Sequence, residues 1–257
     1  MILQKKYNEI WKDPDSFFTF GHFNYEEARM IMDFIPEHDW AGLSVLEIGC
    51  GWGELAAMMA MAGANVLAID YSIEAIMKAR EQFNLPGLRY ETFEWPDAKG
   101  RFDVIVMQGV LEHFDEPWLE LRNMIGSKLA HRDSACVITT SPSFLNPRGY
   151  VWMTLQLLFD VPMSLTDKHF FFRNQFMQFA EQNRLDLAMR ECDYDWGNHE
   201  KMLIDFRKRL PKALADVKMK GNTDKLMMWL AKASEHIDPE PRGTGATMGY
   251  KLSRKVK

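Results

Sequence analysis

Residues 45–62 have the pattern of a strand, a glycine-rich turn and a helix, which restricts the fold more than any other part of the chain. The run Val45–Ile48 is followed by Gly49, Gly51 and Gly53, and helix-favouring residues come directly after them. Glycines at this spacing let the backbone turn sharply out of a strand and approach a ligand closely, because no Cβ stands in the way. The turn delivers that ligand to the amide groups of a helix N-terminus. The pattern therefore predicts a nucleoside-type cofactor site.

The charges around this turn distinguish between nucleoside cofactors. In the dinucleotide fingerprint G-x-G-x-x-G, the glycines let a pyrophosphate sit at the helix N-terminus. Here the third glycine comes one residue early, Glu54 occupies the sixth place, and Glu47 precedes the turn. Each carboxylate would repel a pyrophosphate by an energy on the order of 1 kcal/mol or more. S-adenosylmethionine (SAM) carries an ammonium and a sulfonium group and no phosphate, so the charge pattern favours SAM over NAD.

Strand-like and helix-like segments alternate along much of the chain. Such alternation predicts an α/β fold, in which a parallel sheet carries helices on both faces. The expected strands are Ser44–Ile48, Asn65–Asp70, Leu88–Phe93, Phe102–Met107, Ala135–Ser141, Leu185–Cys192 and Ala246–Leu252. The helices expected among the first five strands are Glu54–Ala62, Ser72–Phe83 and Trp118–Leu129. In such sheets the ligand lies beyond the carboxyl ends of the strands, where the strand order reverses.

Segments outside this alternation complete the expected organisation, which is a single domain over residues 1–257. Its expected parts are an N-terminal lid and helical segment (1–43), a core (44–193 and 243–257) and two acceptor-side insertions (143–172 and 194–242). The insertions are expected to shape and cover the acceptor pocket. The alternative is that they are extra helices packed on the core.

Composition bears mainly on partners and location. The net charge is −5, which argues against a general grip on nucleic acid, since that grip relies on many cationic contacts. Cys50, Cys136 and Cys192 lack metal or redox spacing, and we expect them to be reduced. The first residues show no signal peptide pattern, and the apolar stretch Tyr150–Phe159 falls short of the roughly 20 residues that span a bilayer. We expect a soluble, cytoplasmic protein without a membrane span.

From Val45 to Ser141 the chain resembles the class I SAM-dependent methyltransferases. Val45–Glu54 matches the first motif of that family, Asp70 matches the acid that binds both ribose hydroxyls, and Val110–His113 matches its Val-Leu-Glu-His signature. A carboxylate can accept from two adjacent hydroxyls in charge-assisted bonds, and a helix N-terminal cap is the alternative role for Asp70. The resemblance implies a Rossmann-like fold, a seven-stranded, mostly parallel sheet with helices on both faces, plus helical lid insertions.

The resemblance also implies a set of cofactor contacts, with SAM as the methyl donor and S-adenosylhomocysteine (SAH) as the product. The residues Thr92 to Trp95 depart from the Asp-Ala or Asp-Leu pair that the family often has in this loop. The implied cofactor residues are Glu47, Gly49, Cys50, Gly51, Trp52, Gly53, Asp70, Tyr71, Phe93, Glu94 and Gln108.

The acceptor side points to a small molecule methylated at oxygen. Methyl transfer from a sulfonium is an in-line displacement, in which the enzyme mainly supplies alignment. A hydroxyl acceptor must also lose its proton, and histidine is the residue best suited to take it near neutral pH. His113, at the carboxyl end of the fourth strand, and His169 are the expected catalytic residues, with bracing of the loop as the alternative role for His113. N- or C-methylation, and a non-catalytic SAM-binding protein, are the alternative functions.

A site that binds a divalent metal is the less favoured alternative. In the ubiquinone-pathway O-methyltransferases, which the chain partly resembles, a Glu-x-x-Glu-His segment and a later histidine hold a metal. This chain has the corresponding Glu112, His113 and His169, but Gly109 stands in the first glutamate position. The loss of one carboxylate weakens such a site, so we expect the histidines to act without a metal.

Overall fold

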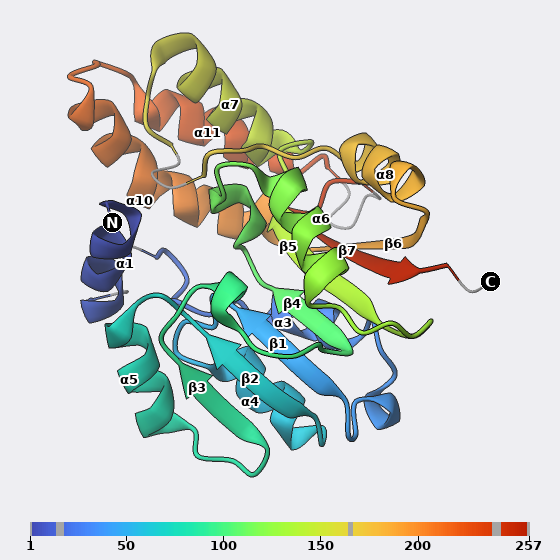
Figure 1. The fold of residues 1–257 in the computed structure, drawn as a ribbon. Coiled ribbons are helices and arrows are strands. Elements are labelled where there is room, and N and C mark those ends of the chain that lie inside the picture. The colour runs from blue at the N-terminus through green and yellow to red at the C-terminus, as the bar shows by residue number, and fades with distance from the viewer. Residues whose placement is uncertain (1, 14–17, 164–166, 238–242, 256–257) are drawn as a thin grey trace. The chain divides into compact units, whose positions relative to one another are not determined.

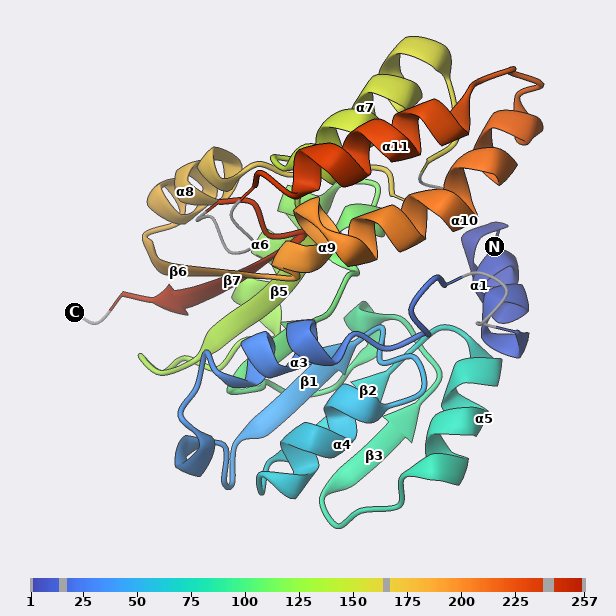
Figure 2. The same ribbon diagram turned by 180° about the vertical axis from the view of Figure 1, so that it is seen from behind.

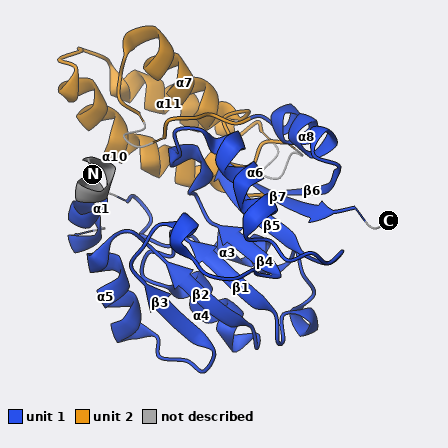
Figure 3. Cartoon of the chain, in the orientation of Figure 1, with its two compact units in different colours: residues 1–141, 172–190, 249–257 blue, residues 142–171, 191–248 orange. Residues whose placement is uncertain are grey.

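A computed structural model describes residues 2–13, 18–163, 167–237 and 243–255, with side chains from residue 7 onward. The chain divides into two compact units, coloured separately in Figure 3. Unit 1 comprises residues 1–141, 172–190 and 249–257, and unit 2 comprises residues 142–171 and 191–248. The insertions expected at 143–172 and 194–242 fall almost wholly in unit 2. The single-domain organisation stays a prediction.

A seven-stranded sheet forms the centre of unit 1 (Figure 1), which confirms the expected fold class. Its strands lie in the order β3-β2-β1-β4-β5-β7-β6. The pairs β2–β3, β1–β2, β1–β4 and β4–β5 are parallel. The strands are β1 (Ser44–Ile48), β2 (Asn65–Ile69), β3 (Leu88–Glu91), β4 (Val104–Met107), β5 (Cys136–Pro142), β6 (Leu185–Cys192) and β7 (Thr247–Arg254).

Helices cover both faces of this sheet, as the alternation predicts. On β7, a Cβ at Gly249 would lie 2.8 Å from the Met30 side chain, whereas the Tyr250 ring stacks on Phe176 with centroids 3.6 Å apart. Neighbouring residues of a strand point to opposite faces, so the helices that carry Met30 and Phe176 lie on opposite sides. Figures 1 and 2 show this arrangement from the two sides. The unit 1 helices are α1 (Ile2–Lys12), α3 (Tyr25–Met32), α4 (Glu54–Met61), α5 (Ile73–Gln82), α6 (Pro117–Ser127) and α8 (Arg173–Gln182), with short 3-10 turns η1 (Glu37–Asp39), η2 (Trp95–Asp97) and η3 (Leu111–His113).

Some strand ends differ from the expected ones by two residues. β3 ends at Glu91 rather than at Phe93, because the chain turns into η2 there. β4 begins at Val104 rather than at Phe102, which makes only an isolated parallel bridge to Leu129. These ends are set by where neighbouring strands begin and stop, and apolar periodicity does not record that.

The strand order places the candidate site at the edge where the motifs were expected. From β1 the chain builds outward through β2 and β3, then returns to add β4 and β5 on the other side of β1. The order therefore reverses between β1 and β4, and in sheets of this kind ligands bind beyond the carboxyl ends of the strands at such a point. The glycine turn follows β1, and the Val110–His113 signature follows β4.

Unit 2 is helical and has its own hydrophobic core. Its helices are α7 (Pro147–Phe159), α9 (Tyr194–Asn198), α10 (Glu200–Asp216) and α11 (Thr223–Ser234). The core contains fully buried side chains of Val161, Met163, Met202 and Phe206. The helix α10 continues through Pro211 to Asp216, and the buried Ala213 and Leu214 that follow this proline belong to the same core. Every helix in the described residues is too short or too polar to cross a lipid bilayer.

A buried ion pair lies inside unit 2. The Arg148 Nε lies 3.3 Å from Asp205 Oδ2, and Arg209 Nε lies 3.4 Å from the other oxygen. The Arg148 guanidinium is also placed 4.3 Å from the Trp152 ring and 4.4 Å from the Trp196 ring. Burial lowers the pKa of Arg148 to about 10, and the charge of Asp205 opposes this shift. Asp205 thus compensates a charge that has no access to water.

Asp205→Ala is expected to lower the free energy of unfolding by about 3–5 kcal/mol, because it leaves the Arg148 charge buried without its carboxylate. Urea unfolding followed by circular dichroism measures the change. Asp216→Ala is the control, because this acid is exposed at the end of the same helix and should change stability by about 0.5 kcal/mol or less. Equal effects of the two substitutions would contradict a structural role for the buried pair.

Candidate functional site

The turn after β1 adopts a backbone that only glycine accommodates easily. Gly49, Gly51 and Gly53 have φ of 74°, 53° and 88°. A Cβ at Gly53 would come within 2.8 Å of the Tyr90 ring, whose hydroxyl donates to the Gly53 carbonyl at 3.3 Å. The amides of Gly49 and Cys50 donate to the Ile69 carbonyl, so the turn is fastened across the end of β2. The Cys50 side chain is buried.

Glu47 is a buried carboxylate at the base of this turn. Its side chain is only 2% exposed, and its Oε2 atom has no hydrogen-bond partner in the described part of the chain. Burial raises its pKa well above the usual value, and the negative charges of Glu54 and Asp70 raise it further. A cationic group at this position would satisfy the orphaned oxygen and relieve the repulsion.

Glu54, the other acid beside the turn, already has a partner. Its Oε1 lies 2.6 Å from His22 Nε2. The His22 ring also packs on Trp52, with ring centroids 4.1 Å apart. Glu54 begins α4, where a carboxylate is favoured by the helix dipole. Glu54 therefore has a structural role, since it contacts His22 and begins α4.

Asp70 connects the glycine turn to the next helix. Its Oδ2 accepts from the Gly51 amide at 3.1 Å, and its Oδ1 accepts from the Ser72 amide at 2.8 Å. Burial raises its pKa to about 6, although the two amides act in the opposite direction. The N-cap of α5 is Ser72, whose hydroxyl accepts from the Ala75 amide. The alternative of Asp70 as the helix cap is therefore wrong, and its carboxylate keeps further lone pairs for a ligand.

The N-terminal helix α1 covers the turn, and the role of residues 1–43 as a lid stays a prediction. A Cβ at Gly51 would lie 2.7 Å from the Trp11 ring, and Trp11 packs on Trp52 with centroids 6.0 Å apart. The Ser72 hydroxyl donates to Asn8 Oδ1 at 2.6 Å. Aromatic and polar contacts thus place α1 over the predicted cofactor residues of unit 1.

The remaining predicted cofactor residues lie at the carboxyl ends of the strands. Tyr71 packs edge-on against Tyr7, and burial raises the pKa of its hydroxyl. After β3, Phe93 is half-buried and Glu94 is exposed just ahead of η2. After β4, Gln108 Nε2 donates to the Asn24 carbonyl at 3.3 Å.

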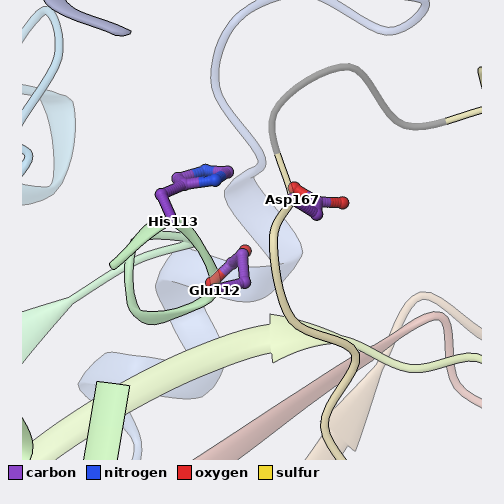
Figure 4. A group of neighbouring side chains, drawn as sticks. All are labelled: Glu112, His113 and Asp167. Atoms are coloured by element: carbon purple, nitrogen blue, oxygen red, sulfur yellow. The ribbon is translucent and has the colours of Figure 1, made fainter. Parts of the chain in front are cut away.

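Glu112 and His113 lie on η3, the short turn after β4. Glu112 is buried and His113 is half-buried, and Figure 4 shows both side chains leaving this turn. The His113 Nε2 lies 3.0 Å from the Tyr7 hydroxyl, and the two rings meet at 60°. A residue of α1 therefore contacts the predicted catalytic histidine.

Two residues of the candidate site were not predicted from the sequence. They are Tyr7 on α1 and Glu27 on α3. The buried Glu27 carboxylate accepts a hydrogen bond from the Thr140 hydroxyl, which in turn accepts from the Gly109 amide at 3.0 Å. The available signal was an acid on the apolar side of an amphipathic helix, beside the buried Ala28 and Ile31.

His169 lies in unit 2, whereas Glu112 and His113 lie in unit 1. Its ring stacks on Phe171, with centroids 6.0 Å apart and planes at 13°. The catalytic role of His169 and its part in a metal site stay predictions. At the remaining position of the metal pattern, Gly109 supplies a backbone amide and no ligand atom.

Comparison with known proteins agrees with this geometry. A family model described as a methyltransferase domain matches residues 20–196 of the chain. A ubiquinone biosynthesis O-methyltransferase from Nitrosospira multiformis is 32% identical over 201 residues, which are 74% of this chain and 79% of that protein. A trans-aconitate 2-methyltransferase from Deinococcus radiodurans is 34% identical over 113 residues, 43% of each chain. The chain thus aligns with less than half the length of this second relative.

A solved structure shares the fold. Magnesium protoporphyrin IX methyltransferase from Synechocystis PCC 6803, solved with bound SAH, gives a TM-score of 0.61 over 99% of each chain. The sequence identity is 14%, so this likeness is one of fold.

Glu47→Gln is expected to stabilise the ligand-free protein at pH 8, with a smaller effect at pH 5. The pKa of Glu47 is higher in the folded than in the unfolded state, so the contribution of this carboxyl to stability is present at low pH and is lost as the pH rises. The uncharged amide avoids that loss. Urea titrations at pH 5, 6, 7 and 8 measure the difference between the variant and the unsubstituted protein.

Glu181→Gln is the matched control, because Glu181 is an exposed carboxylate on α8. Its effect should be small and nearly constant over this pH range. A Glu47→Gln variant that loses stability at pH 8 would show that the carboxylate is satisfied in the ligand-free protein.

Proposed function

Because this chain belongs to the S-adenosylmethionine-dependent methyltransferases, we propose that it methylates a hydroxyl oxygen of a small molecule by direct in-line transfer. The observation that carries the proposal is the position of His113 at the carboxyl end of β4, with Nε2 at hydrogen-bond distance from Tyr7. This end of β4 adjoins the end of β1, where the glycine turn begins.

The residues around the glycine turn support a cofactor role that matches the charges of SAM. Glu47 would bind the methionyl ammonium, since it is a buried carboxylate with an orphaned oxygen. Asp70 would accept from the two ribose hydroxyls while its amide bonds hold it in place. The turn itself provides close backbone approach, and Tyr71, Phe93, Glu94 and Gln108 would complete the site.

The proposed reaction needs one proton acceptor. The acceptor oxygen attacks the methyl carbon, the sulfur–methyl bond breaks with its electron pair going to sulfur, and the hydroxyl proton passes to His113. The products are SAH and a methyl ether or ester. The Tyr7 hydroxyl would orient the ring or exchange hydrogen bonds with the acceptor, because it already contacts the same nitrogen. General-base assistance of this kind contributes typically 10²–10⁴-fold to a rate.

The choice of oxygen is supported by the Nitrosospira relative, whose name specifies O-methylation. N- and C-methylation are the alternatives, because one fold serves several acceptors. Incubation with methyl-labelled SAM and a panel of phenols, carboxylic acids and amines, analysed by mass spectrometry, tests the proposal. Methylation confined to amines or carbon would overturn the oxygen assignment, and SAM binding without any transfer would favour a non-catalytic role.

From the titration of Asp70, SAM affinity is expected to rise about fivefold between pH 5 and pH 6 and less steeply above pH 6. Burial raises the pKa of Asp70 to about 6 in the free protein, and the bound form requires the carboxylate, so binding releases a proton. Glu47 acts in the same direction. Calorimetry at four pH values in two buffers of different ionisation enthalpy measures both the affinity and the proton release.

Asp70→Asn should flatten much of this pH dependence and weaken SAM binding about tenfold or more at pH 7.5, since it removes charge-assisted hydrogen bonds. Asp133→Asn, at an exposed acid in the loop before β5, is the control and should leave the profile unchanged. If the Asp70→Asn profile kept its full slope, the titrating group would be another residue.

His113→Ala is expected to lower kcat for a hydroxyl acceptor found in the panel by about 10²–10⁴-fold, because the proton then has no local base. The Kd for SAM should stay within about twofold, since His113 is not among the residues proposed to bind the cofactor. Rapid-quench kinetics and calorimetry measure the two quantities. His38→Ala, at an exposed histidine of η1, should change neither, and an unchanged kcat in His113→Ala would remove this residue from the mechanism.

A further inference from the structure

The outer side of α7 in unit 2 is unusually apolar for an exposed helix. Between Arg148, which is buried, and the end of the helix at Phe159 there is no charged residue. Tyr150, Leu157, Leu158 and Phe159 are all exposed, and Leu157 is 72% exposed. A helix that packs only on its own unit would place polar residues at these positions. This face has the composition of one that meets an apolar phase.

The helix α11 continues this exposed apolar face. Met228 and Trp229 are exposed on it, Trp229 by 64%. Trp229 lines a hollow of about 250 Å³ together with Tyr150 of α7. Tyr150 also lines a second hollow of about 440 Å³ that runs along α7 past Leu157 and Leu158. Figure 2 shows α7 and α11 next to each other, and the shared Tyr150 makes the face continuous. We call Tyr150, Leu157, Leu158, Phe159, Met228 and Trp229 the α7–α11 surface.

The segment that contains α11 has an excess of positive charge. Residues 200–236, which contain α10 and α11, hold nine Lys and Arg against five Asp and Glu, a net charge of +4 in a chain whose total is −5. On α11 the exposed Lys225 and Lys232 lie three to four residues on either side of Met228 and Trp229. That spacing places all four side chains on neighbouring positions of one helix side. The acids of α11 and its cap, Asp224 and Glu235, are at the two ends of the helix.

We propose that the α7–α11 surface docks on an anionic lipid bilayer, with its apolar side chains in the interface and its lysines at the headgroups. Helices that lie in a membrane interface combine an apolar face, aromatic residues and flanking lysines in this way. The lysine stems can lie along apolar surface while their ammonium groups reach phosphates. The helices would rest on the bilayer without crossing it. This docking is independent of the chemistry proposed for unit 1.

The charges favour a bilayer over a second copy of the chain. A two-fold dimer uses the same patch on both subunits, so it would bring two sets of Lys225 and Lys232 into one interface. These lysines would repel each other there. Anionic headgroups instead neutralise every lysine at once, and their attraction falls within a Debye length of the surface.

Co-sedimentation with vesicles tests the proposal. The full chain is mixed with phosphatidylcholine vesicles that contain either no phosphatidylglycerol or about 40% of it. Each mixture is prepared at about 0.1 M and about 0.5 M salt, which changes the screening length about twofold. We expect binding to the anionic vesicles that weakens at least fivefold at the higher salt concentration. The double variant Leu157→Ser/Leu158→Ser should bind at least tenfold more weakly, and Lys225→Glu/Lys232→Glu should lose the preference for anionic lipid.

Met61→Ser is the matched control, because Met61 is an exposed methionine on α4 of unit 1 and its loss should leave vesicle binding unchanged. All substituted positions are exposed, so circular dichroism should show unchanged folding. Absence of binding to either vesicle would overturn the proposal. It would also be overturned if analytical ultracentrifugation showed a dimer that the Leu157→Ser/Leu158→Ser variant dissociates, since the surface would then join copies of the chain.

Discussion

The rest of the site depends on the repulsion among the carboxylates at the carboxyl ends of β1 and β2. Glu47 and Asp70 are buried there, and Glu54 stands beside them at the start of α4. Burial and the charges of Glu54 and Asp70 raise the pKa of Glu47, and burial raises that of Asp70 against the effect of two backbone amides. The fold tolerates this because backbone amides hold Asp70 and because His22 contacts Glu54. This excess of negative charge favours a cationic ligand independently of the ligand's shape.

The fold of unit 1 and the positions of its candidate cofactor residues could be predicted from the sequence, because the signals for both are local. A strand, three alternating glycines and a helix start lie within ten residues, and Asp70 directly follows the next strand. Parallel topology then brings these separate signals to one edge without any further information. The exact strand ends could not be predicted, since they depend on which neighbour each strand meets.

Other contacts could not be predicted because they join distant parts of the chain. Tyr7 and His113 are 106 residues apart, and Glu27 and Thr140 are 113 apart. No local pattern in Tyr7 or Glu27 identifies its partner. The buried Arg148–Asp205 pair of unit 2 is similar, because each residue alone reads as an ordinary charge on a helix. For Glu27 the visible signal was an acid on the buried side of α3, and the identity of its partner required the structure.

The hydroxyl of Ser72 contacts two helices of unit 1 in different ways. Its oxygen accepts from the Ala75 amide and caps α5, while its single proton goes to Asn8 on α1. The two functions use opposite ends of the same group, so α1 can leave without uncapping α5. Separation of α1 would break the Ser72–Asn8 and Tyr7–His113 hydrogen bonds and remove the contact of Trp11 with Trp52, while α5 keeps its N-cap. The Ser72 hydroxyl thus links α1 to the glycine-turn region without making the N-cap of α5 depend on α1.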